Sequence, residues 1–399
     1  MHQNIQNLMK VAGKQDRIII GLMSGTSMDG LDIALCAISG SGKATNFELK
    51  AFTTIEYSAD FKAKILSIFS KEMVALESLT LLNTWVGQQH GKMVLSALKA
   101  WDIDPNKVDM IASHGQTIYH APKSLHPNSE YGPATLQIGD GDHIAVTTGI
   151  MTLSDFRQKH VAAGGEGAPL AVYGDFLLCS HPTENRLLLN MGGIANFTYL
   201  AAGCSLEDVF STDTGPGNTL MDAYARTHFS PLAYDKGGEI AALGKINATL
   251  LAALKAHTFF SLGLPKTIGP ELFNLDFLAK AQAASNTFAI SHQDVMATLN
   301  RFSAETIVDC IHSSLPKGTK FNMYSSGGGM HNPVLMGHLQ ALLPNATLYS
   351  SDLLGIHPDA KEAILFALLG NEAVAGTPLF AGGHATKIPV TMGKFSFPN

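Results

Sequence analysis

Residues 18–35 read IIIGLMSGTSMDGLDIAL, and residues 187–200 read LLLNMGGIANFTYL. Each stretch is an apolar run, a short turn of glycine and small polar residues, and a second apolar run, which predicts two strands joined by a tight turn. Glycine allows the turn backbone a positive φ and lets a ligand approach the amide groups closely. Amides exposed in this way form a concavity for an anion such as phosphate. Two such hairpins in separate halves of the chain therefore predict two related domains that bind a polyphosphate from both sides.

The composition excludes several classes of protein. The chain has 399 residues, of which 46% are hydrophobic and 15% charged, so it is globular and long enough for two or three domains. Its net charge of −6 argues against nucleic-acid binding. The four cysteines are widely separated and form no C-x-x-C pair, which argues against a disulfide framework or a zinc site. No apolar run reaches the ~18 residues of a membrane span, and residues 1–17 do not resemble a signal peptide. We therefore expect a cytoplasmic protein with no membrane or nucleic-acid partner.

Strand-like and helix-like segments alternate along the chain, which indicates an α/β protein with mixed sheets flanked by helices. The first domain is expected to comprise residues 1–145 and 376–399, and the second residues 146–375 with a helical insertion near 240–315. Beyond the hairpins, we expect helices near 61–69, 76–99, 333–343 and 359–375, and strands near 107–113, 134–138, 209–213 and 323–326.

The hairpin turns supply the candidate nucleotide-binding residues. The first turn predicts contacts to ATP phosphates from Gly25, Thr26, Ser27, Met28, Asp29, Gly30, Leu31 and Asp32. Asp29, with Asp32 beside it, is the candidate ligand for Mg²⁺ and its waters. The second turn and a third glycine run predict further contacts from Gly192, Gly193, Asn196, Gly327, Gly328 and Gly329. Alternatively, the polar side chains only satisfy local turn amides, and the glycines only permit tight packing or cap a helix.

Motifs of several other enzyme classes are absent. The chain contains no G-x-x-x-x-G-K-[ST] nucleotide loop and no H-E-x-x-H metal motif. It also lacks the H-R-D-L set of protein kinases and the G-x-S-x-G elbow of esterases.

The order of elements is similar to that of the superfamily of sugar kinases, actin and heat-shock chaperones, and more narrowly the chain resembles the anhydro-N-acetylmuramic acid kinase family. The matching stretches cover nearly the whole chain in the family's order: residues 21–32, 113–117, 136–140, 155–157, 164–169, 189–196, 213–218, 326–329 and 359–363. The resemblance implies two ribonuclease H-like domains that close over ATP in a cleft between them. It further implies a reaction in peptidoglycan recycling, in which water attacks C1 of the anhydro sugar while O6 takes the γ-phosphoryl group. ATP and Mg²⁺ are the implied cofactors, the sugar is the implied small-molecule partner, and a homodimer is compatible with the family.

Candidate residues for this reaction follow from the same stretches. Asp155 matches the family's catalytic aspartate, and a carboxylate suits the general base that activates water; the alternative is an ion pair with Arg157. Asp213 is a possible second acid group, or only a contact to the turn after it. The candidate sugar-binding residues are His114, Gln116, Gln137, Arg157, Asp213 and Asn218. Arg157 suits the lactyl carboxylate, whereas His114 could equally be a core histidine.

Three other functions fit parts of the pattern. An ATP-gated assembly protein would need the phosphate turns but neither Asp155 nor the His114-Gln116 pair. A plain glycoside hydrolase could use Asp155 and Asp213 but would leave both phosphate turns without a role. A kinase of a different sugar is the nearest enzymatic alternative.

Overall fold

The computed structural model describes residues 1–123, 126, 128, 130–167, 170–269, 272–356, 359–378 and 388–399. These residues form two compact units: residues 1–179, 205–207 and 356–399 make the first, and residues 180–204 and 208–355 make the second. The predicted boundaries at 145/146 and 375/376 therefore differ from those of the units. The last helix packs against the central strands of the first sheet, so it belongs to the first unit. Within the predicted motifs, Ala168 and Pro169 lie outside the described residues.

The first unit contains a seven-stranded mixed sheet. Its strands are β1 (Asp16–Ser24), β2 (Gly30–Ser39), β3 (Asn46–Glu56), β4 (Met110–Ala121), β5 (Ala134–Ile138), β6 (Thr152–Ser154) and β12 (Lys394–Ser396). The order is β12-β6-β4-β1-β2-β3, and β5 pairs with β4. β1, β2 and β3 form an antiparallel meander, whereas β4 and β6 continue parallel to β1. The helices are α1 (Gln3–Ala12), α2 (Ala59–Leu66), α3 (Leu76–Ala100), α4 (Gly141–Thr148), α5 (Phe156–Ala162), α6 (Ala171–Cys179) and α13 (Lys361–Ala375).

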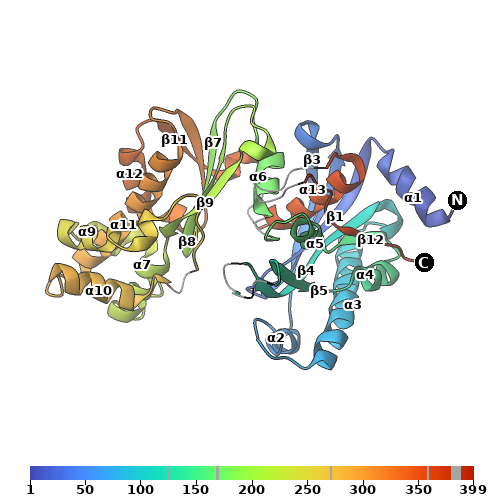
Figure 1. The fold of residues 1–399 in the computed structure, drawn as a ribbon, viewed down its shortest axis with the longest axis horizontal. Helices are drawn as coiled ribbons and strands as arrows, with labels where there is room; N and C mark the ends of the chain where they lie inside the picture. Colours follow the sequence, from blue (N-terminus) through green and yellow to red (C-terminus); the bar gives the residue numbers. More distant parts are fainter. Residues whose placement is uncertain are drawn as a thin grey trace. The chain divides into compact units, whose positions relative to one another are not determined.

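Both faces of this sheet are covered, which explains why β1 is buried along nearly its whole length. Ile20 and Leu22 share one hydrophobic cluster with Val86 and Val94 of α3. On the alternate positions of β1, Gly21 faces α13: a Cβ on Gly21 would lie 1.8 Å from the carbonyl oxygen of Ala363. Glycine thus allows α13 to lie directly on the strand that leads into the first turn. Figure 1 shows the red α13 beside the blue β1, although they come from opposite ends of the chain.

The second unit contains a five-stranded sheet with the order β11-β10-β7-β8-β9. Its strands are β7 (Arg186–Met191), β8 (Ile194–Leu200), β9 (Phe210–Pro216), β10 (Phe321–Ser326) and β11 (Ala346–Ser350). β7, β8 and β9 form an antiparallel meander, whereas β10 and β11 continue parallel to β7. The two units therefore repeat one strand order, which confirms the predicted pair of ribonuclease H-like domains with mixed sheets.

The helices of the second unit are α7 (Thr219–His228), α8 (Glu239–Leu243), α9 (Ala248–Lys255), α10 (Leu275–Ser285), α11 (His292–Ser314) and α12 (Pro333–Leu342). α11 joins two cores. Its Phe302 packs with residues of α7, α9 and α10, and its Ile307 packs with β7, β8 and α12. Among the described residues, none of the helices is both long and apolar enough to cross a membrane. All four cysteines are free and buried.

Candidate active site

The first turn connects β1 to β2 and is anchored by Met28. Thr26 and Ser27 at its tip are exposed, whereas Met28 is buried in the core although its φ is 57°. A bulky side chain in the left-handed region is strained, and such strain is found most often at functional sites. The N–H of Met28 also donates to the carbonyl oxygen of Gly25. The turn is therefore a fixed structure that presents Thr26 and Ser27 to solvent.

Several carboxylates lie around this turn. Burial raises the pKa of Asp32, the hydroxyl of Thr54 donating to its Oδ1 (2.6 Å) opposes the rise, and the charges of Asp359 and Asp29 add to it. Burial also raises the pKa of Glu362, in the first turn of α13, and the charge of Asp32 contributes. Asp29 is exposed. Among the described residues, no three acidic, histidine or cysteine side chains come close enough together to hold a metal without other ligands.

His114 and Arg157 form one buried pair. The Nε–H of Arg157 donates to Nε2 of His114 (2.9 Å), and its NH1 donates to the carbonyl oxygen of Gly167 (2.7 Å). Burial lowers the pKa of His114 to about 3, with the charge of Arg157 acting in the same direction, so His114 is neutral at pH 7. Burial lowers the pKa of Arg157 only to about 10, which leaves it charged. His114 is 3% exposed, so it supports Arg157 rather than offering itself to a sugar.

Gln116 and Gln137 differ in whether their side-chain oxygens accept a hydrogen bond. Gln116 is fully buried; its Oε1 accepts from Ser24 (2.5 Å), and its Nε2 donates to the carbonyl oxygens of Gly25 and Thr117. These bonds hold Gln116 beneath the first turn, and its contact with a sugar stays a prediction. Gln137 is half-buried, and its Nε2 donates to the hydroxyls of Thr135 and Thr117, whereas its Oε1 accepts no hydrogen bond from the described residues. Gln137 therefore retains a free acceptor.

Asp155 follows β6 and precedes α5. Its φ is 59°, a conformation that aspartate tolerates better than most residues, and its side chain makes no capping bond to α5. Its Oδ2 forms an ion pair with Lys394 of β12, which pairs with β6. The predicted partner Arg157 is instead bound to His114. Asp155 thus has a cation beside it, but not the one that the sequence suggested.

In the second unit, polar side chains form a row across four strands. Ser326 pairs with Asn190, Asn190 with Asn196, and Asn196 with Asp213 in the sheet register. Residues directly opposite each other in a ladder point to the same face. Burial raises the pKa of Asp213, and the N–H of Ile268, which donates to its Oδ2 (2.7 Å), offsets part of the rise. The row places an aspartate of raised proton affinity beside Asn196.

The glycine turns of the second unit meet at the end of this row. The N–H of Gly217 donates to the carbonyl oxygen of Gly193 (2.8 Å), and that of Asn218 to the carbonyl oxygen of Gly192 (2.8 Å). Gly327 has φ 79°, and a Cβ on it would lie 2.7 Å from the carbonyl oxygen of Met191. The structure therefore brings together, within the second unit, the two glycine segments predicted there for the nucleotide, at Gly192-Gly193 and at Gly327.

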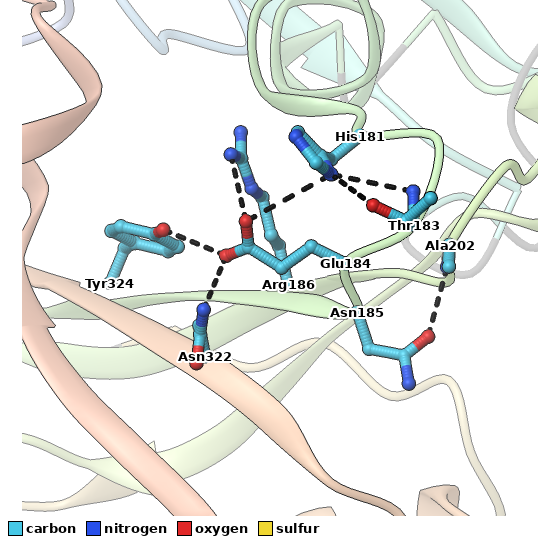
Figure 2. A network of polar contacts seen from close by, with 8 residues as sticks. All are labelled: His181, Thr183, Glu184, Asn185, Arg186, Ala202, Asn322 and Tyr324. Carbon is cyan, nitrogen blue, oxygen red and sulfur yellow. Dashed lines mark hydrogen bonds and ion pairs between the residues drawn. The ribbon is translucent and has the colours of Figure 1, made fainter.

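A separate polar network lies near the N-terminal ends of β7 and β10, away from the glycine turns (Figure 2). Glu184 accepts from Asn322 (2.6 Å) and Tyr324 (2.8 Å) and is paired with Arg186 (3.1 Å). Burial alone would raise the pKa of Glu184, but these hydrogen bonds and the charge of Arg186 outweigh it and lower the pKa to about 2. Each donor comes from the sheet itself, so this network stabilises the pairing of β7 with β10.

Comparison with known proteins identifies the family. The family model described as anhydro-N-acetylmuramic acid kinase matches residues 17–392. The chain belongs to the anhydro-N-acetylmuramic acid kinase family. Proteins of that name from Pseudoalteromonas atlantica and Pseudoalteromonas translucida are 56% and 54% identical, each over 100% of both chains. One from Caldanaerobacter subterraneus is 36% identical over 98% of this chain and 100% of its own.

Solved structures give only distant matches. The component A of (R)-2-hydroxyglutaryl-CoA dehydratase from Acidaminococcus fermentans is 11% identical, with a TM-score of 0.41, over 90% of this chain and 99% of its own. That similarity is too low to argue from.

Sequence reasoning missed two groups of residues in this member of the anhydro-N-acetylmuramic acid kinase family. The sequence predicted a helix near 359–375 and gave Asp359 and Glu362 no role in the site, although two acids in a stretch that matches the family were a usable signal. Tyr57 and His90 carried no motif, and only the fold places them beside Ser24.

Proposed function

We propose that this protein uses ATP to phosphorylate O6 of 1,6-anhydro-N-acetylmuramic acid while water opens the internal ether. The C1–O6 bond breaks, the water oxygen binds C1 and gives a proton to a carboxylate, and O6 takes the γ-phosphoryl group. The products are N-acetylmuramic acid 6-phosphate and ADP. The observation that carries this proposal is the full-length identity of 56% to a relative of that name.

The phosphates are assigned to the glycine turns of both units. Thr26 and Ser27 offer exposed hydroxyls and amides, and the segments at Gly192 and Gly327 offer backbone that no Cβ obstructs. Mg²⁺ suits the acidic side chains around the first turn, because it takes one or two carboxylates and completes its shell with phosphate oxygens and water. We assign it to Asp32 and Glu362, with Asp29 as the exposed third candidate. When bound, the ion would neutralise charge on the phosphates.

We assign the general base to Asp213 in preference to Asp155. A base works best when its pKa lies near the working pH, and burial moves the pKa of Asp213 in that direction. Asp155 instead forms an ion pair with Lys394 of β12, so its carboxylate already has a partner within the first unit. This exchanges the roles that the sequence suggested for the two aspartates.

The sugar's polar arms are assigned to Arg157 and Gln137. Arg157 is a charged guanidinium whose Nε and NH1 donate to His114 and Gly167. Its NH2 donates no hydrogen bond to the described residues, so it suits the lactyl carboxylate. The free Oε1 of Gln137 suits the N–H of the acetamido group. In this proposal, His114 holds Arg157 and Gln116 holds the first turn, and neither contacts the sugar.

Labelled water tests the reaction itself. The protein is incubated with ATP, Mg²⁺ and the anhydro sugar in ¹⁸O-labelled water, and the products are analysed by mass spectrometry. We expect ADP, a 6-phosphate, and ¹⁸O at the anomeric oxygen. The amount of label should exceed that of a control in which unlabelled product is kept in the labelled water for the same time. A 6-phosphate without excess label at C1 contradicts the coupled ring opening.

A pair of isosteric variants tests the base. We expect Asp213→Asn to lose about 10²-fold or more in kcat with ATP binding kept. Asp155→Asn keeps its shape and tolerates the same φ, so we expect it to retain most turnover. The opposite ranking returns the base to Asp155.

The proposed setting is the bacterial cytoplasm, in the recycling of peptidoglycan fragments. A homodimer is proposed from the family alone, and light scattering coupled to size-exclusion chromatography tests it.

A further inference from the structure

A chain of buried polar side chains lies beneath the first turn. The hydroxyl of Tyr57 lies 2.7 Å from Oγ of Ser24 and 2.9 Å from Nε2 of His90. Ser24 in turn donates to Oε1 of Gln116 (2.5 Å). These four side chains are between 0% and 4% exposed. They come from β1, the residue after β3, α3 and β4, so the chain links four elements beneath the turn.

The direction of these hydrogen bonds follows from counting protons. The single hydroxyl proton of Ser24 goes to Gln116, so the hydroxyl of Tyr57 must donate to Ser24. The oxygen of Tyr57 is then the acceptor for His90, which must carry its proton on Nε2. Burial lowers the pKa of His90 to about 4, so the ring is neutral at pH 7 and this tautomer supplies one donor. The chain runs one way, from His90 through Tyr57 and Ser24 to Gln116.

Tyr57 and Gln116 also hold the backbone of the turn. The N–H of Tyr57 donates to the carbonyl oxygen of Asp29 (3.1 Å), at the end of the turn. Nε2 of Gln116 donates to the carbonyl oxygen of Gly25 (3.3 Å), at its start. Both ends of the turn are thus tied to the same buried chain, and only Thr26 and Ser27 between them are exposed.

Packing alone does not require these polar groups. The ring of Tyr57 stacks on Phe61 with centroids 3.9 Å apart, and a phenylalanine would keep that contact. Burying a hydroxyl and an imidazole costs free energy unless every bond is made, and a satisfied network mainly fixes one geometry.

We infer that Tyr57 and His90 are positioning residues that hold the first turn in the shape that binds the ATP phosphates. The inference rests on the proposed function for the identity of the ligand. Neither residue contacts the nucleotide in this account; each acts through Ser24 and Gln116 on the carbonyl of Gly25.

Four single variants test it, with ATP affinity measured by titration calorimetry and KM for ATP and sugar measured separately. We expect Tyr57→Phe to raise both Kd and KM for ATP about tenfold, the effect of losing one to two buried hydrogen bonds, and to leave KM for the sugar within about twofold. His90→Phe removes only the outermost donor, so we expect a rise of about two- to threefold. His90→Gln restores a donor near the position of Nε2, and we expect it to return within about twofold of the parent protein.

Tyr173→Phe is the matched control, because Tyr173 is fully buried in the same unit and its hydroxyl has no partner among the described residues. We expect it to leave ATP affinity unchanged. Melting temperature is recorded for every variant. A Tyr57→Phe protein that melts lower but binds ATP with unchanged Kd has lost only stability, and that result overturns the inference.

The inference and the proposed function fail in different ways. If the parent protein binds ATP but forms no sugar phosphate, the proposed function fails, and the calorimetric series still decides the role of Tyr57 and His90. If the parent protein does not bind ATP, both are wrong.

Discussion

The network around Glu184 allows a quantitative prediction about acid stability (Figure 2). Glu184→Gln removes the negative charge while keeping the size of the side chain, so Arg186, Asn322 and Tyr324 lose a charged acceptor. A pKa that falls from 4.5 to about 2 on folding means that the ionised carboxylate stabilises the folded state. This stabilisation is complete above about pH 4.5 and is lost as the pH falls toward 2.

The pKa change sets the size of the effect. Each tenfold change in proton affinity is worth about 1.4 kcal/mol, so the fall to about 2 corresponds to about 3 kcal/mol. The Glu184 side chain is 23% exposed, and solvent screening reduces the expected value to about 1–2 kcal/mol. For a unit of this size, that corresponds to a loss of about 2–8 °C in melting temperature at pH 7.

Thermal unfolding followed by circular dichroism at pH 7, 4.5 and 3 measures the effect. We expect the parent protein and Glu184→Gln to differ most at pH 7 and least at pH 3. Glu48→Gln is the control, because Glu48 pairs with Lys50 on the surface and is 68% exposed, so its melting temperature should not change. Equal melting temperatures of Glu184→Gln and the parent at pH 7, or a difference that stays constant down to pH 3, would refute the reasoning.

Three further predictions concern packing, the sugar and the pH profile. Gly21→Ala places a Cβ against the backbone of α13, so its free energy of unfolding in urea should fall by about 2–3 kcal/mol. Gly337 is exposed in α12 with nothing near its Cβ, so Gly337→Ala should raise the free energy of unfolding by about 0.5–1 kcal/mol, and the reverse order would contradict the packing argument. Arg157→Lys keeps the charge but loses the planar fork held by His114, so KM for the sugar should rise about tenfold with KM for ATP unchanged; a change in KM for ATP alone would place Arg157 elsewhere. Because burial raises the pKa of Asp213, kcat/KM should fall toward acid pH with a midpoint above the ordinary aspartate pKa of 3.8, and substitution of Asp213 should change this midpoint. A midpoint below 3.8 would exclude Asp213 as the base.

Local pattern predicted the elements whose signals lie close together in the chain. Both hairpins are as expected, because an apolar run on each side of a glycine turn is a short-range signal. The helix from Leu76 to Ala100 and the strand from Ala134 to Ile138 also follow the predicted ranges. β3 (Asn46–Glu56) was not predicted, since its half-buried positions, which largely alternate with exposed ones, are only partly apolar.

The missed parts of the site depend on contacts between distant residues. The partner of Asp155 is Lys394, 239 residues away, and no sequence spacing brings the two together. In the same way, α13 joins the first unit because Gly21 leaves room for it, a fit that only the folded backbone reveals. Tyr57 reaches Ser24 because β3 pairs beside β2, and the sequence offered no reason to connect them.

The two units repeat one strand order, but their glycine turns, which we propose bind the phosphates, are held in opposite ways. In the first unit, mainly side chains hold the turn: Met28 is buried in the core, and Tyr57 and Gln116 donate hydrogen bonds to the backbone at the two ends of the turn. In the second unit, the turn is held by backbone packed on backbone, and a Cβ on Gly217 would lie 2.3 Å from the carbonyl oxygen of Gly192.

Deleting one buried hydroxyl should therefore weaken the first turn by degrees, because each hydrogen bond contributes about 1 kcal/mol. Adding one methyl group at Gly217 should disrupt the second turn outright, because backbone cannot move aside as a flexible side chain can.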